Sequence, residues 1–195
     1  CYYLNEKEIC QEIKNAHNSY ITNFKYYLDK INNRDLILSI SQSDNNIKLW
    51  QVNNWECLLN LPHANSDGIL YSSSFINDDN NIYIVTSNCN WDDNNEYIKV
   101  YDFNGKKIKE INDSNEITFF IDVYYDELHD NNYIITGNLN CIKLYDYKKN
   151  ELYKKYYDKN NETDNNCHFI VIINKNEKST NIIESCDDGN IRIWD

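Results

Sequence analysis

The chain has 195 residues, which suits one domain or two small ones. Its formal net charge is −12, from 19 basic and 31 acidic residues, so it lacks the basic footprint typical of nucleic-acid and anionic-membrane binding. Aromatic residues make up 14% of the sequence and 17 residues are tyrosine, so we expect a β-rich core of tyrosine and isoleucine.

The cysteines give no sign of a metal or disulfide framework. There are seven, an odd number, and no two have C-x-x-C spacing. We therefore expect reduced, mostly buried thiols in a cytoplasmic or nuclear protein that is not secreted. No apolar run approaches transmembrane length, and no signal-peptide pattern is present. The cysteines are Cys1, Cys10, Cys57, Cys89, Cys141, Cys167 and Cys186.

Asparagine is abundant and recurs in pairs between apolar segments, as at Asn32-Asn33 and Asn45-Asn46. Asparagine tolerates the left-handed backbone conformation of turns better than other non-glycine residues, and the sequence holds only 4 glycines. The pairs therefore predict turns. A compositional bias from an AT-rich genome is an alternative explanation, and both can hold together.

Short β-branched and aromatic runs alternate with these turns along the whole chain. The predicted strands fall into successive groups of four, with three in the last group. Helical periodicity is absent between them, and the connections are too short for crossover helices, which excludes parallel β-α-β units. In chain order the strands are residues 19–27, 35–41, 44–51 and 56–61; 69–76, 81–88, 94–102 and 106–111; 117–125, 132–138, 139–146 and 151–157; and 168–173, 181–186 and 188–195.

The third strand of each group repeats one pattern: apolar, basic, apolar, aromatic. The four copies read DNNIKLWQ, NNEYIKVYD, LNCIKLYD and DGNIRIWD, and their aromatic residues lie 44 to 51 positions apart. These aromatic residues are Trp50, Tyr101, Tyr145 and Trp194. Four antiparallel strands in a repeat of this length are typical of a propeller blade.

The first repeat carries further features: Ala16-His17 upstream, then Ser39, Ser41 and Asp44 before the Ile-Lys-Leu-Trp of residues 47–50. With these residues the chain resembles the WD-repeat β-propeller family over nearly its whole length. The resemblance implies an all-β fold of propeller blades with four antiparallel strands each. We expect about four blades in an incomplete ring.

The chain is predicted to be one propeller unit over residues 1–195. Its expected parts are an outer strand in 1–16, blades at 17–62, 63–114 and 115–160, and a blade without a fourth strand at 161–195. Either residues 5–13 pair beside residues 190–194 to close a four-bladed ring, or the chain is a slice of a larger propeller. The second interpretation is preferred, with the remaining blades in the parent chain, because the family commonly builds seven blades and Tyr2 fits the aromatic slot of an earlier blade.

The resemblance also implies a hydrogen-bonded network inside each blade, formed by a His, a Ser or Thr, an Asp and the Trp. In the first blade these are His17, Ser39, Asp44 and Trp50. A buried indole N–H and a buried imidazole both call for hydrogen-bond partners. A catalytic triad of Ser39, His17 and Asp44 is the alternative, disfavoured because Ser39 lies mid-strand among apolar residues. Counterparts elsewhere are Thr86 with Asp92 or Asp93 and Tyr101; Thr136, Asn140 and Tyr145; and Asp188 and Trp194, with Glu184 in place of Ser.

A candidate partner-binding site lies in the enlarged turn at residues 88–97. In the related fold this turn sits on the partner-binding face, so Trp91 beside Asp92 and Asp93 has the composition of a binding hot spot. The alternative is an insertion whose Trp91 folds back onto its blade. The acidic pair lacks the spacing of a calcium loop. Tyr20 is a further partner-binding candidate.

The function that the resemblance implies is a non-catalytic scaffold for protein–protein interaction, binding neutral or basic proteins and using no cofactor. Glycine-rich phosphate loops, metal-ligand clusters and a plausible active-site loop are all missing from the sequence, so no enzyme is predicted. Two alternatives stay open: a propeller that binds a nucleic acid or phosphoinositide, and a propeller enzyme. Membrane insertion is not expected.

Overall fold

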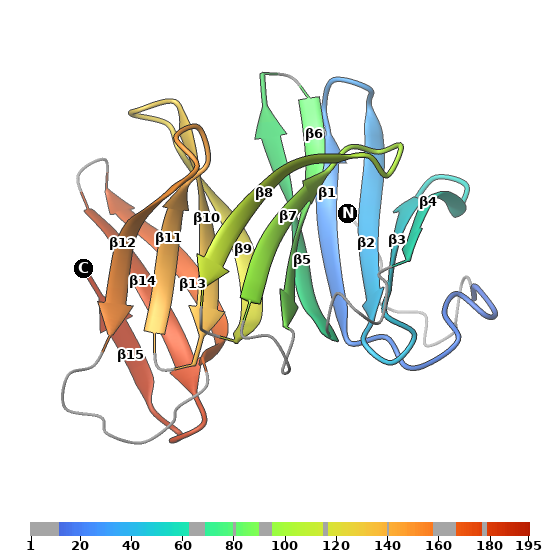
Figure 1. The fold of residues 1–195 in the computed structure, drawn as a ribbon. Helices are drawn as coiled ribbons and strands as arrows, with labels where there is room; N and C mark the ends of the chain where they lie inside the picture. The colour runs from blue at the N-terminus through green and yellow to red at the C-terminus, as the bar shows by residue number, and fades with distance from the viewer. Residues whose placement is uncertain are drawn as a thin grey trace, which may run out of the picture.

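The computed structural model describes residues 12–62, 69–79, 81–89, 95–114, 117–139, 141–157, 167–176 and 179–195. These ranges contain fifteen strands in four antiparallel sheets that follow one another along the chain. The first sheet, at the right of Figure 1, has the order β1-β2-β3-β4. Its strands are β1 (Asn23–Asp29), β2 (Arg34–Ser41), β3 (Asn46–Gln51) and β4 (Glu56–Pro62).

The second and third sheets repeat this meander, with orders β5-β6-β7-β8 and β9-β10-β11-β12. Their strands are β5 (Ile69–Asp78), β6 (Asn81–Cys89), β7 (Asn95–Tyr101), β8 (Lys107–Ser114), β9 (Thr118–Asp126), β10 (Asn131–Asn138), β11 (Cys141–Asp146) and β12 (Glu151–Tyr157). The fourth sheet, red in Figure 1, has three strands: β13 (Cys167–Asn176), β14 (Ser179–Cys186) and β15 (Ile191–Trp194).

Consecutive sheets stack face to face through their first strands. Strand β5 contacts β1 and β2, β9 contacts β5 and β6, and β13 contacts β9 and β10. The sheets therefore lie in an arc, as Figure 1 shows, with the first and fourth sheets at its two ends. This all-β architecture, a partial ring of propeller-like sheets, confirms the predicted fold class.

Each sheet interface encloses one apolar cluster. Between sheets 1 and 2, Leu38 and Leu49 are fully buried against Phe75 and Ile84. Similar clusters join sheets 2 and 3 and sheets 3 and 4. In a two-sided sheet with period-2 alternation, one face packs on the preceding sheet and the other on the following one. This explains why the third strands read apolar-x-apolar: Ile47 and Leu49 point toward the next sheet.

The first strands also meet at the inside of the arc. Asp122 of β9 receives a hydrogen bond from Ser74 of β5 at 2.8 Å and an ion-pair contact from Lys25 Nζ of β1 at 2.6 Å. One carboxylate thus links three successive sheets. Because this ion pair is partly exposed, its contribution to stability is modest.

The predicted asparagine turns are present. Of the seven non-glycine residues with positive φ in the described ranges, four are asparagine, including the paired residues Asn33 and Asn45. Asp29 supports the first of these turns, since it is fully buried and accepts hydrogen bonds from Arg34 Nε and from Asn32. Burial raises the pKa of Asp29, but these hydrogen bonds outweigh burial, and the net shift is downward.

The aspartate that follows the aromatic residue of the second and third repeats has a local role in the structure. Asp102 accepts hydrogen bonds from the backbone N–H groups of Asn104 and Lys106, and Asp146 accepts one from Lys149. The side chain thereby shapes the turn into the fourth strand, as aspartate often does at the first position of a turn. The described part of the chain contains no helix with the length and apolarity needed to cross a membrane.

Candidate functional site

The hydrogen-bond network of the first sheet joins a loop to two strands. His17, in the segment before β1, lies with Nε2 2.7 Å from Ser39 Oγ of β2. The indole N–H of Trp50 on β3 donates to the same Ser39 oxygen at 2.8 Å. Asp44 lies on the far side of the imidazole, with Oδ2 3.3 Å from His17 Nδ1, and accepts a hydrogen bond from the backbone N–H of Asn18. The structure thus brings together the four residues singled out in the first repeat.

The geometry of these four residues suits a structural role. Ser39 is only 1% exposed, and its oxygen already accepts the indole hydrogen bond, so a substrate carbonyl has no access to it. With the Ser39 hydroxyl donating to Nε2, the His17 proton resides on Nδ1 and faces Asp44. The network therefore anchors the segment before β1 onto the sheet.

The protonation of His17 gives a direct test of this geometry. Burial lowers the pKa of His17 from its ordinary value of 6.5, Lys48 lowers it further, and Asp44 opposes both. Because the folded protein holds the neutral imidazole, the stability that His17 contributes is present above about pH 6.5 and is lost as the pH falls through the lowered pKa. An NMR titration of the His17 ring should show an apparent pKa below 6.5. A value at or above 6.5 would instead indicate an imidazolium stabilised by Asp44.

The second sheet keeps the strand register of this network. Thr86 pairs with Lys99 in the same register in which Ser39 pairs with Lys48, and Tyr101 occupies the place of Trp50. Thr86 is fully buried, and its hydroxyl donates to the Lys99 carbonyl at 3.5 Å. The Thr86 side chain thus bonds to the backbone of the neighbouring strand β7.

In the third sheet, a different polar chain occupies the same region. The Thr136 hydroxyl donates to Asn138 Oδ1 at 2.6 Å, and Asn138 Nδ2 donates to Thr118 Oγ1 at 2.9 Å. Tyr145 is buried at the position of Trp50, while Asn140 lies outside the described residues. Asn138 and Thr118 were missed in the sequence. The available signal was the two-residue spacing of Thr136 and Asn138, which places both side chains on one face of β10.

The fourth sheet replaces the serine with a buried carboxylate. Trp194 Nε1 donates to Glu184 Oε2 at 3.0 Å, and Arg192 contacts both Glu184 Oε1 at 3.5 Å and Asp188 Oδ2 at 2.5 Å. Hydrogen bonds from the backbone and side chain of Asn190, with help from Arg192, lower the pKa of Asp188 to about 2. Glu184 thus takes over the acceptor role of Ser39, and Arg192 balances its charge.

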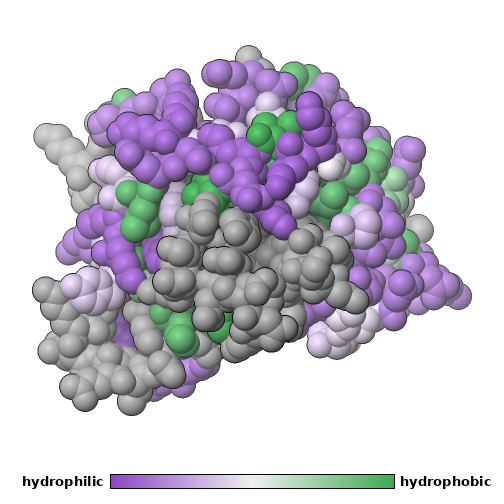
Figure 2. All heavy atoms as spheres, viewed as in Figure 1, coloured by the Kyte–Doolittle hydropathy of each residue, from purple (hydrophilic) through white to green (hydrophobic). Residues whose placement is uncertain are grey.

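Of the predicted partner-binding residues, the structure describes only Tyr20. Trp91, Asp92 and Asp93 lie outside the described residues. Tyr20 is 64% exposed before β1 and belongs to a stretch with other exposed apolar side chains, among them Phe24 and Tyr26. Among the residues coloured in Figure 2 most are hydrophilic, and the hydrophobic ones form small separate patches.

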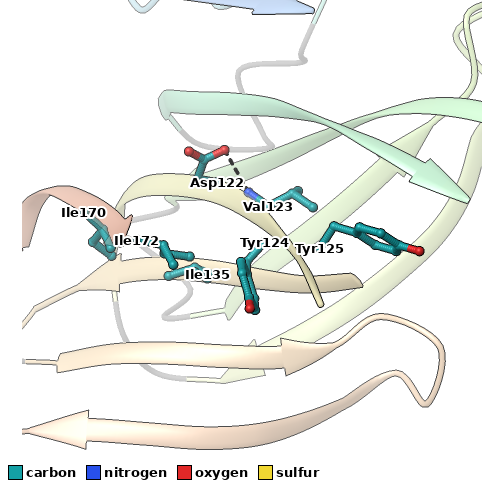
Figure 3. Close-up of a pocket in the computed structure, with 7 residues that line it drawn as sticks. All are labelled: Asp122, Val123, Tyr124, Tyr125, Ile135, Ile170 and Ile172. Carbon is teal, nitrogen blue, oxygen red and sulfur yellow. Dashed lines mark hydrogen bonds between the residues drawn. The ribbon is translucent and has the colours of Figure 1, made fainter. Parts of the chain in front are cut away.

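A further concave region lies at the interface of sheets 3 and 4. A cavity of about 350 Å³ lies between β9, β10 and β13, lined by Tyr124, Ile135, Ile170 and Ile172, with Asp122 at its edge (Figure 3). It adjoins a groove of about 860 Å³ that shares three of these residues and continues over the outer strand β12. Within the described ranges, no three His, Cys, Asp or Glu side chains gather in a group that could hold a metal ion.

Comparison with known proteins identifies the fold class. No protein family and no curated protein matches the sequence. Of 165 matching solved chains, one is the dihydro-heme d1 dehydrogenase NirN in complex with DHE, with a TM-score of 0.61 and 17% identity. The match covers 91% of this chain and 36% of that one, so this chain spans about a third of that protein's length. At this identity the similarity shows the fold alone: the chain has a β-propeller-like fold.

Proposed function

We propose that this chain is part of a WD-repeat-like propeller that acts as a non-catalytic scaffold for protein–protein interaction. The WD-repeat character is supported by the contacts among His17, Ser39 and Trp50, and by the same cross-strand register in all four sheets. The arc is proposed to continue into further blades of a larger propeller in the cytoplasm or nucleus.

The observation that carries the binding role is the outer face of β1. Phe24, Tyr26 and Leu28 alternate along this strand and are 62%, 59% and 44% exposed. Tyr26 of β1 and Phe75 of β5 occupy equivalent positions in their two sheets. Phe75 is only 6% exposed, because it packs on the first sheet. The face of sheet 1 therefore has the character of a contact surface, which either a further blade of the propeller or a partner protein would cover.

The proposed function is tested by removing the apolar side chains of this face. Complexes isolated with the Phe24→Ser/Tyr26→Ser double variant should lose protein partners that the wild type retains. The matched control is Ile108→Ser, since Ile108 is 43% exposed on β8 of the second sheet and lies outside this face. Partners retained by the double variant would contradict the proposal.

The alternatives are tested with the same variants. Nucleic acid or phosphoinositide vesicles should show no saturable binding, because the net charge of −12 repels both. Saturable binding that the double variant retains would favour the nucleic-acid or phosphoinositide alternative. Turnover of a substrate by the purified protein would favour the enzyme alternative.

A further inference from the structure

Two cysteines of the fourth sheet lie opposite one another on neighbouring strands. Cys167 begins β13 and Cys186 ends β14, and the antiparallel register of these strands pairs the two residues directly. They are 19 positions apart in the sequence, so it is the strand pairing that brings their backbones together.

The other cysteines in the described strands are paired differently. Each lies opposite a residue that is not cysteine: Cys57 opposite Trp50, Cys89 opposite Ile69, and Cys141 opposite Tyr157. Among the strand registers that the structure describes, cysteine is therefore paired with cysteine at this one position.

The backbone hydrogen bonds of Cys186 show which kind of pair it forms with Cys167. The N–H of Cys186 donates to the Asn190 carbonyl at 3.4 Å, and the Cys186 carbonyl accepts from the N–H of Gly189 at 3.1 Å. Both backbone groups therefore point toward the turn into β15. Because the N–H and C=O of a strand residue point to the same side, Cys186 and Cys167 form a non-hydrogen-bonded pair.

This kind of pair has the spacing that a disulfide needs. In a non-hydrogen-bonded pair of antiparallel strands the Cα atoms are about 4.5 Å apart, closer than in a hydrogen-bonded pair. Disulfides join residues whose Cα atoms are roughly 4.4–6.8 Å apart. The register of β13 and β14 therefore allows a bond between the two sulfur atoms without a shift of either strand.

We propose that Cys167 and Cys186 form a redox modification site, which a small-molecule disulfide such as glutathione disulfide oxidises to an intramolecular cross-strand disulfide. The bond joins the first strand of the fourth sheet to the second. The site is separate from the face of β1 that carries the proposed scaffold function and goes beyond that function.

The oxidation consists of two thiol–disulfide exchanges. In the first, the Cys167 sulfur attacks one sulfur of glutathione disulfide, the S–S bond of the oxidant breaks, and one glutathione leaves with the proton of the Cys167 thiol. In the second, the Cys186 sulfur attacks the Cys167 sulfur of the mixed disulfide, and the other glutathione leaves with the Cys186 proton. The two cysteines are oxidised, and one glutathione disulfide is reduced to two glutathione molecules.

The surroundings of Cys186 assign it to the second exchange. Its thiol is half-buried and donates a hydrogen bond to Glu184 Oε1 at 3.0 Å. Burial and the neighbouring Glu184 carboxylate raise the pKa of Cys186 to about 12, so at neutral pH the thiol is protonated and attacks a free oxidant slowly. Attack on a sulfur held on the neighbouring strand is intramolecular, which offsets this disadvantage. The oxidation should therefore become faster as the pH rises above neutral, because the thiolate is the attacking species.

The test is oxidation of the full chain with glutathione disulfide, followed by blocking of the remaining thiols, tryptic digestion and mass spectrometry. Trypsin places the two cysteines in different peptides, residues 160–175 and 179–192, each of which contains a single cysteine. The expected product is these two peptides joined, with a mass two hydrogen atoms below the sum of the separate peptides. Dithiothreitol should separate them again.

The matched variants are Cys186→Ser and Cys57→Ser. Cys57 is exposed and lies opposite Trp50, so its replacement removes a thiol without affecting the pair. Oxidation should raise the melting temperature of the wild type and of Cys57→Ser by about 5 °C, because a closed loop restricts the unfolded chain. The melting temperature of Cys186→Ser should not rise.

Three results would overturn the inference. They are glutathione adducts on Cys167 or Cys186 without the joined peptides, linkage of Cys186 to a different cysteine, and a disulfide-linked dimer of the chain on a non-reducing gel. The digest of the wild-type protein distinguishes the first two without relying on the folding of any variant.

Discussion

Replacing Leu38 with alanine is expected to lower the free energy of unfolding by about 3 kcal/mol, within the range for removing a fully buried leucine side chain. Leu38 is 0% exposed and lies in the cluster that joins sheets 1 and 2. The loss combines the transfer free energy of the removed carbons with the cost of the cavity that they leave. Urea denaturation followed by circular dichroism measures it.

The control for Leu38→Ala is Leu152→Ala. Leu152 is 49% exposed on the outer strand β12, so its truncation should change stability by no more than about 0.5 kcal/mol. Equal losses at the two positions would mean that sheets 1 and 2 do not enclose a common core.

Replacing Glu184 with alanine is expected to cost about 2 kcal/mol, because a partly buried indole N–H and a partly buried guanidinium lose the same acceptor. Glu184 is 6% exposed and accepts hydrogen bonds from Trp194 and Arg192. The loss is at the lower end for a broken buried ion pair, since Arg192 keeps Asp188 as a partner.

The conservative variant Glu184→Gln separates the contribution of the oxygen acceptor from that of the negative charge. Glutamine retains an oxygen acceptor for the Trp194 indole but not the negative charge, so its cost should be about 1 kcal/mol. Denaturation curves for both variants, recorded at one ionic strength, provide the comparison. An alanine variant as stable as the wild type would show that Glu184 is not the acceptor of Trp194.

Much of the fold was predictable from the sequence because the repeat is regular. The apolar-basic-apolar-aromatic pattern marks the third strand of each sheet, and the asparagine pairs mark turns. The link between Trp50 and Ser39 was implied by the family resemblance, and it agrees with the need of a buried indole for an acceptor. Strand ends were set by turn conformations that the pattern indicates only approximately, as at Asp79 and Asp130, where aspartate rather than asparagine has positive φ.

The candidate site was less predictable, because its residues depend on which face of each strand meets which sheet. Phe24 and Tyr26 lie in the predicted strand of residues 19–27, and only the arc shows that their face is exposed. Glu184 read as a lost network position, although a carboxylate accepts an indole hydrogen bond as well as a serine does when an arginine balances its charge.

The central claim, that the four sheets stack in chain order in a propeller-like arc, is tested most directly by NMR contacts between aromatic rings. One ring pair spans each interface: Tyr27 and Phe75 at 5.1 Å, Tyr71 and Phe119 at 5.3 Å, and Tyr156 and Trp194 at 5.8 Å between centres. The account predicts nuclear Overhauser effects within all three pairs. If these rings instead showed contacts only within their own sheets, the stacked arrangement would be wrong.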